Sequence, residues 1–273
     1  HRLIEGDNRK SIRDDEVTIG QMLKSAGYAT AHYGKWHLSG GGPEANGYDE
    51  SDGDTGNRDA DAHVDPNPVD LFGMTERATA FMEKQKQAGK PFFLQMTYYA
   101  LHLPENALKS TRAFYEKQSP GRMHSNVDVA AITTDLDTAV GRLLESLDRL
   151  GLADHTVIVF TSDHGYHMGE HGLWQKMTLF EEATRVPLLI VAPGTSRAGG
   201  VARAPVSHLD LYPTLTALSG VPAPEGLHGQ NLVPLLRDPA QAGRGWVLSQ
   251  VTRNAGAVAS AAKQAGGKVA GKG

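Results

Sequence analysis

The chain has 273 residues, with 27 Lys and Arg against 31 Asp and Glu, which gives a formal net charge of −4. This length suits one large α/β domain or two small ones, and this charge gives no broad electrostatic reason to bind nucleic acid or an anionic membrane. Cysteine is absent, which excludes disulfides, thiolate metal sites and cysteine nucleophiles, and no apolar run approaches the roughly 18 residues of a membrane span.

Helical and strand patterns alternate in the first part of the chain. Thr18 and Gln21 have the spacing of a capping box, which predicts a helix that ends near Gly27 and is followed by a strand over residues 28–33. Residues 39–70 are rich in Gly, Asp, Asn and Pro. They predict a long surface excursion, of a kind that often borders a functional site.

The next predicted elements are a helix, a strand and a long helix. Thr75 is predicted to cap a helix that runs through Gln87, and the apolar run 92–98 is predicted to be a buried strand. The strongest helical periodicity lies between Leu136 and Leu150, where Leu and Val recur at spacings of 4, 3, 4 and 3. This alternation of helix and strand predicts an α/β domain.

Two further apolar runs, 156–161 and 187–192, predict continuous strands of the kind that is covered on both faces in a parallel sheet. Pro213 is predicted to begin another helix. Residues 254–273 contain Ala, Gly and Lys with scarcely a large apolar side chain. Such a segment buries too little surface to offset its ordering entropy, so a loose tail is predicted.

A lysine and a histidine follow the first predicted strand, in the sequence Gly34-Lys35-Trp36-His37. Ligands of open α/β sheets bind at the carboxyl ends of strands. The ammonium group can neutralise an anionic oxygen and the imidazole can exchange a proton, and ester cleavage requires both. Taken alone, such a pair at the start of a loop is more often simply solvated.

A second cluster, Ser162-Asp163-His164-Gly165, follows the predicted strand 156–161. The Asp163 carboxylate suits calcium or magnesium, whereas the His164 nitrogen is more typical of zinc or manganese, so the residues leave the metal open. The polar residues shortly after it are interpreted as solvent-facing loop residues, because the glycines among them disfavour a helix. These residues are His167, Glu170 and His171.

His102 follows the predicted strand 92–98, and Lys176 lies in the loop beyond the second cluster. Either residue alone carries little weight. Because the ends of parallel strands meet at one edge of a sheet, the four segments are expected to surround a single anion. The six side chains expected there are Lys35, His37, His102, Asp163, His164 and Lys176.

These motifs resemble the sulfatases of the alkaline-phosphatase superfamily. The resemblance runs from about Asp15 to Asp238, and it is nearest to the branch with iduronate-2-sulfatase and many bacterial arylsulfatases. It implies an alkaline-phosphatase-like layered sandwich with a mostly parallel central sheet and helices on both faces. The matching segments are Gly27-Tyr28-Ala29-Thr30, Gly34-Lys35-Trp36-His37, Ser162-Asp163-His164-Gly165 with its continuation through Lys176, and Thr184-Arg185-Val186-Pro187.

The resemblance also implies roles for the six side chains. Asp163 and His164 match ligands of a divalent ion, usually calcium, with magnesium, manganese or zinc as alternatives. The other four match residues that contact the sulfate group or the nucleophile, and His102 among them is the candidate acid for the leaving alcohol. These four are Lys35, His37, His102 and Lys176. The implied substrate is a small-molecule or carbohydrate sulfate ester.

The nucleophile of the family is a formylglycine made within a Cys/Ser-x-Pro-x-Arg motif, which the 273 residues do not contain. The adjacent Asp14 and Asp15 precede a helix rather than follow a strand, so they are not interpreted as the family's pair of metal-binding aspartates. Residues 1–253 are therefore expected to be an incomplete catalytic domain, without the nucleophile segment and the smaller C-terminal sheet. By itself this chain is expected to have negligible turnover.

Two other functions stay open at this point. A phosphodiesterase or phosphonate monoester hydrolase uses the same scaffold, because a tetrahedral anion beside a metal looks alike for sulfur and phosphorus. A non-catalytic anion-binding relative is the other alternative. Sulfatases are commonly exported, but the sequence leaves the compartment, the natural substrate and the oligomeric state open.

Overall fold

A computed structural model describes residue 12 and residues 15–251. They divide into two compact units. The first unit consists of residues up to 155 together with 219–228, and the second consists of 156–218 together with the described residues from 229 onward. The tail predicted over 254–273 lies outside the described residues.

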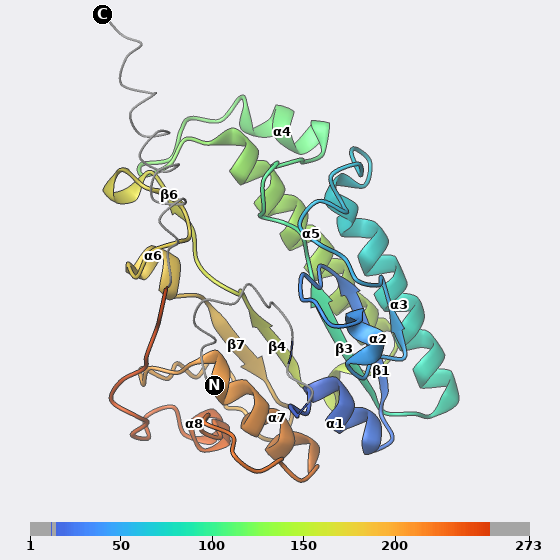
Figure 1. Ribbon diagram of the computed structural model, residues 1–273. Helices are drawn as coiled ribbons and strands as arrows, with labels where there is room; N and C mark the ends of the chain where they lie inside the picture. The colour runs from blue at the N-terminus through green and yellow to red at the C-terminus, as the bar shows by residue number, and fades with distance from the viewer. Residues whose placement is uncertain (1–11, 13–14, 252–273) are drawn as a thin grey trace, which may run out of the picture. The chain divides into compact units, whose positions relative to one another are not determined.

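The first unit is built around a three-stranded parallel sheet of order β2-β1-β3. Figure 1 shows the long helices α3 and α5 running side by side, and α3 packs against β1 and β3. Its elements in chain order are α1 (Ile19–Ser25), β1 (Ala29–Gly34), α2 (Gly42–Ala45), β2 (Glu50–Ser51), η1 (Pro68–Asp70), α3 (Leu71–Ala88), β3 (Phe92–Thr97), α4 (Lys109–Tyr115), α5 (Val127–Arg149) and η2 (Ala153–His155).

The predicted capping box is confirmed at the start of α1. The Gln21 amide donates to Thr18 Oγ1 at 3.0 Å, and the Thr18 amide donates to Gln21 Oε1 at 2.9 Å. The predicted strands on either side of the excursion are also confirmed, as β1 and β3. The excursion itself contains β2, a strand that sequence patterns missed because only two of its residues pair with β1.

The two faces of β1 have different neighbours. Odd-numbered residues of the strand join a core cluster with Ala78 and Phe81 of α3, and Phe92, Leu94 and Met96 of β3 pack on the same cluster. On the other face Thr30 and His32 are also buried, at 0% and 1% exposure. The second face of β1 is therefore polar but buried, so these side chains need hydrogen-bond partners inside the protein.

Helix α3 begins at Leu71, so the prediction that Thr75 caps it is wrong. Asn67 lies before the helix, and its Oδ1 accepts the amide hydrogens of Phe72 at 2.9 Å and Gly73 at 3.1 Å. Thr75 lies inside the helix and donates its hydroxyl to the Leu71 carbonyl at 2.8 Å. Local patterns favoured Thr75 because a threonine before an apolar run is a common cap. The Asn67 side chain reaches the start of α3 only because the turn between them, η1, brings it there.

The long helix predicted up to Leu150 is confirmed as α5, which begins earlier than the periodicity indicated. Asn126 caps it, because its Oδ1 accepts the Val129 amide hydrogen at 3.1 Å. Gly151 follows the helix with φ of 65°, a left-handed conformation that glycine adopts without steric cost.

The second unit contains two small antiparallel pairs of strands, β4 with β7 and β5 with β6. Pro213 lies within its longest helix, which begins two residues earlier than predicted. The elements of this unit are β4 (Ile158–Thr161), β5 (His167–Met168), η3 (Glu170–Gly172), β6 (Trp174–Gln175), α6 (Glu181–Thr184), β7 (Leu188–Val191), η4 (His208–Asp210), α7 (Leu211–Ser219) and α8 (Val233–Arg237).

The strands predicted at 156–161 and 187–192 are confirmed, but their interpretation as covered parallel strands is wrong. Ile158 lies opposite Val191 and Thr161 opposite Leu188 in an antiparallel register. Three of the apolar side chains are exposed, at 42% for Phe160, 56% for Leu189 and 51% for Val191. A short apolar run specifies neither the direction of the neighbouring strand nor the number of covered faces.

A buried carboxylate organises the end of the second unit. Asp210 has 0% exposure and accepts the Ser207 amide hydrogen at 2.8 Å and the Gln230 amide hydrogen at 2.7 Å. Arg244 forms an ion pair with it. Its charge is thus compensated by three donors, as burial requires. Within the described residues no helix is both long and apolar enough to cross a bilayer.

Candidate functional site

The first candidate site segment is the Lys35 turn, residues 34–37, which leaves the end of β1. The Lys35 amide donates to the Thr97 carbonyl at 2.9 Å, and the Trp36 amide donates to Thr55 Oγ1 at 2.9 Å. The His37 amide donates to the Thr55 carbonyl at 2.6 Å. Hydrogen bonds from two other segments therefore fix the main chain of the turn.

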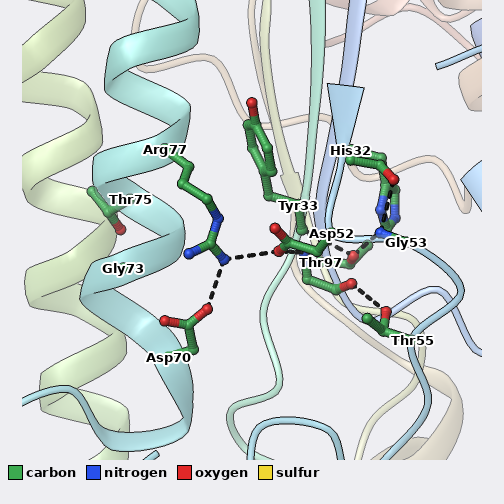
Figure 2. A network of polar contacts seen from close by, with 12 residues as sticks. His32, Tyr33, Asp52, Gly53, Thr55, Asp70, Gly73, Thr75, Arg77 and Thr97 are labelled. Carbon is green, nitrogen blue, oxygen red and sulfur yellow. Dashed lines mark hydrogen bonds and ion pairs between the residues drawn. The ribbon is translucent and has the colours of Figure 1, made fainter. Parts of the chain in front are cut away.

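A polar network lies beneath this turn, and Figure 2 shows its members pointing toward one another. The Gly34 amide donates to Asp52 Oδ2 at 2.8 Å. Arg77 Nη2 donates to the same Asp52 oxygen at 2.9 Å and to Asp70 Oδ2 at 2.6 Å. Burial by itself would lower the pKa of Arg77, but the hydrogen bonds to both carboxylates raise that pKa above its ordinary value. The guanidinium therefore stays charged.

His37 has a left-handed backbone, with φ of 55°. Few residues other than glycine adopt this conformation, and such strain is found preferentially at functional sites. The hydrogen bonds of the turn offset the conformational free energy that this left-handed backbone costs. Neither this backbone nor the network beneath it could be recognised from the sequence, because Asp52 and Arg77 are distant from Lys35 along the chain.

His32 is a second histidine close to the turn, and sequence patterns missed it because it lies inside a strand. Its ring contacts the Trp36 ring edge-on, with centroids 5.2 Å apart, and its Nε2 lies 3.0 Å from Thr97 Oγ1. Burial lowers the pKa of His32 to about 4, with Asp52 acting in the opposite direction. His32 is consequently neutral near pH 7, so it supplies no positive charge to the turn.

His102 lies in the segment after β3. Its amide donates to the Tyr99 carbonyl at 2.9 Å, and its Nδ1 lies 2.9 Å from the Leu103 carbonyl. A carbonyl oxygen only accepts, so Nδ1 carries a hydrogen and Nε2 is the other proton-exchanging atom. Because Gly34 and Thr97 pair at the ends of neighbouring parallel strands, the segments with Lys35, His37 and His102 leave the same edge of the sheet.

In the second unit, Asp163 and His164 follow β4 directly. His164 Nδ1 lies 2.9 Å from the Gly165 carbonyl, so this nitrogen donates and Nε2 is the ring nitrogen on the side of Asp163. That Nε2 lies 3.1 Å from Asp163 Oδ2. Gly165 has no room for a side chain, because an added Cβ would lie 2.0 Å from the Glu182 carbonyl oxygen. The close approach of the Glu182 backbone, together with the hydrogen bond from the Gly165 amide to the Ala183 carbonyl at 2.9 Å, therefore fixes the main chain directly after His164.

The interpretation of His167 as a solvent-facing loop residue is wrong. It belongs to β5, has 0% exposure, and its Nε2 lies 2.7 Å from Thr178 Oγ1. Its strand neighbour in the β5–β6 pair is Gln175, directly before Lys176. The loop prediction failed here because a two-residue strand leaves no periodicity in the sequence. His171 is exposed and stacks on Phe180, with ring centroids 4.2 Å apart.

A family model described as Sulfatase matches residues 3–221 of the sequence. This chain belongs to the sulfatase family. The predicted resemblance is therefore confirmed, and with it the alkaline-phosphatase-like α/β fold.

Curated sulfatases are similar over most of this chain. The ulvan-active sulfatase of Formosa agariphila is 30% identical over 263 residues, which cover 84% of this chain and 51% of that protein. Arylsulfatase A of Homo sapiens is 31% identical, with 84% and 53% covered. The chain spans about half the length of these curated relatives.

Solved structures agree with the sulfatase fold. A crystal structure of Ps i-CgsB has a TM-score of 0.71 and 25% sequence identity, and the match covers 85% of this chain and 60% of that one. The phosphonate monoester hydrolase SpPMH from Silicibacter pomeroyi has a TM-score of 0.66 at 22% identity, with 88% and 65% covered. That second likeness concerns the fold alone.

The donor set of this sulfatase chain fits a divalent ion only in part. Asp163 and His164 present an oxygen and a nitrogen side by side. Over residue 12 and residues 15–251, no group of three or more His, Cys, Asp or Glu side chains is close enough to hold a metal. Calcium takes six to eight ligands, so these two residues would form part of a shell. Convergence of all six predicted side chains on one anion stays a prediction.

Proposed function

We propose that this chain is the central part of a sulfuric ester hydrolase, in which Asp163 and His164 hold a divalent ion beside the sulfate group of the substrate. The observation that carries the proposal is the contact between the two residues. Asp163 Oδ2 lies 3.1 Å from His164 Nε2. An oxygen and a nitrogen held side by side in this way can serve as neighbouring ligands of one divalent ion.

Calcium is the proposed ion, because the family usually uses it, and magnesium, manganese and zinc are also compatible with one oxygen and one nitrogen ligand. Bound there, the ion would offset negative charge on the sulfuryl oxygens. The Gly165 carbonyl, which accepts from His164 Nδ1, would keep the other ring nitrogen directed toward the ion.

Four further side chains are proposed to act on the substrate. Lys35 and Lys176 would neutralise sulfuryl oxygens, and His37 would contact the sulfate or the nucleophile. His102 would protonate the leaving alcohol through Nε2, since its Nδ1 is held by the Leu103 carbonyl. The substrate proposed is a carbohydrate or small-molecule sulfate ester, in keeping with the ulvan-active relative.

The nucleophile is proposed to be a formylglycine supplied by residues other than these 273. The sequence has no cysteine and no Ser-x-Pro-x-Arg string from which it could be made. On this proposal the 273 residues alone turn over sulfate esters negligibly. Phosphonate monoester hydrolysis is the alternative on the same scaffold.

Calcium titration by calorimetry tests the metal proposal. We expect the wild-type chain to bind calcium, and Asp163→Asn to weaken the affinity by roughly tenfold or more, because the variant loses the ligand charge. His164→Gln is expected to weaken it as well. Glu181→Gln is the matched control, since it removes an exposed carboxylate of the same unit, and it should leave the affinity unchanged.

Equal calcium affinity in wild type and Asp163→Asn would show that these residues do not hold the ion. The affinity of the calcium-loaded chain for inorganic sulfate, compared with its affinity for phenylphosphonate, separates the two substrate classes. Tighter binding of the phosphonate would favour the alternative hydrolase.

A further inference from the structure

The Lys35 turn contacts Asp52, a residue that none of the family motifs includes: the Gly34 amide donates to its carboxylate. Asp52 follows β2, whose pairing with β1 places His32 opposite Ser51. The Asp52 amide donates to the His32 carbonyl at 3.2 Å, so the strand pairing continues one residue further. This register brings the Asp52 carboxylate to the end of β1, within 2.8 Å of the Gly34 amide nitrogen.

The position of the Asp52 carboxylate is itself fixed by α3. Arg77, on the second turn of that helix, joins Asp52 to Asp70 through a single nitrogen, Nη2. Asp70 accepts in turn from Asn67 Nδ2 at 2.8 Å, and Asn67 caps the helix. A continuous chain of charge-assisted hydrogen bonds therefore links the start of α3 to the end of β1 (Figure 2).

We propose that Asp52, held by Arg77, is a positioning residue that orients the Lys35 turn for binding the sulfate group. The proposal rests on the proposed function, in which Lys35 and His37 contact that group. Asp52 acts through the main chain, because it accepts the amide hydrogen directly before Lys35. Gly34 is buried, so losing this acceptor leaves an unsatisfied donor at the base of the turn.

Asp52→Ala and Asp52→Asn separate the two contributions of the carboxylate. The alanine variant removes the acceptor for Gly34 and the partner of Arg77. The asparagine variant keeps an acceptor oxygen but loses the charge that attracts Arg77. Arg149→Gln is the matched control, because it removes a comparable 2.9 Å ion pair between Arg149 and Glu83 in the same unit, away from the turn.

Hydrogen exchange of the peptide covering residues 34–37 is the first measurement. All four amides of the turn are hydrogen-bonded, so the wild type should be protected there. We expect exchange roughly tenfold faster in Asp52→Ala, a smaller increase in Asp52→Asn and no change in Arg149→Gln. Exchange of α5 is the internal reference for the two Asp52 variants and should stay at the wild-type rate in both.

Sulfate binding, measured by calorimetry on the same calcium-loaded variants, is the second measurement. Asp52→Ala is expected to weaken sulfate binding roughly tenfold and Asp52→Asn less, because a mobile turn must be ordered on binding. Unchanged exchange at residues 34–37 in Asp52→Ala, or equal acceleration in α5, would overturn the positioning role. If Asp52→Ala does not fold, the same criteria apply to Asp52→Asn.

The two measurements distinguish this proposal from the proposed function. If the wild type binds no sulfate, the proposed function fails, while the exchange experiment still decides whether Asp52 orders the turn. If sulfate binds to the wild type and binds equally well to an Asp52 variant with a loosened turn, the positioning role fails and the proposed function stands.

Discussion

Replacing Gly34 with alanine is expected to lower the free energy of unfolding by more than about 3 kcal/mol. Gly34 has φ of 102°, a region that side chains of L-residues rarely adopt. An added Cβ would lie 2.1 Å from the Thr97 carbonyl oxygen, which already accepts from Lys35. The backbone of β3 would have to move away from β1, and the Lys35 turn would move with it.

Urea denaturation followed by circular dichroism measures this effect, with Gly27→Ala as the control. Gly27 has a similar φ of 89°, but an added Cβ there would meet no atom within 4 Å. The control therefore carries only the backbone strain of a left-handed L-residue, about 1 to 2 kcal/mol. Equal losses of unfolding free energy in the two variants would show that the close approach of β1 to β3 does not add to the cost of Gly34→Ala.

Stability is also expected to fall by up to about 3 kcal/mol between pH 6.5 and pH 4 because of His32 alone. Burial lowers its pKa in the folded chain to about 4, below the ordinary histidine value of 6.5 that applies to the unfolded chain. In this window the unfolded chain binds a proton that the folded chain does not. The stabilisation is therefore fully present above pH 6.5 and is lost as the pH falls toward 4.

The test compares urea midpoints across this pH range in the wild type and in His32→Gln. The variant loses the contact with Thr97 and is less stable at neutral pH, but its stability should depend less steeply on pH. His155→Gln, which replaces an exposed histidine of the same unit, should retain the wild-type slope. Parallel loss of stability in wild type and His32→Gln would mean that His32 does not titrate as its burial requires.

Local sequence patterns were sufficient for the elements whose signals lie within a few residues. Thr18 and Gln21 specify the start of α1 because a capping box involves only neighbouring positions. The apolar run of β3 and the heptad-like spacing of α5 were equally direct. The Lys35 and Asp163 segments could be proposed as site segments because each follows a strand that the sequence predicts.

Features that depend on pairing between distant segments could not be read in this way. The sequence by itself determined the α/β class, the sulfatase motifs and most helices and strands, since these arise from local periodicity and spacing. Only the tertiary structure decided that β2 pairs with β1, that β4 and β7 run antiparallel, and that His167 is buried. It also joined Asp52 to Gly34 and Arg77. The physical reason is that strand register and buried polar contacts depend on which segments meet in space. Local sequence patterns do not show which distant segments those are.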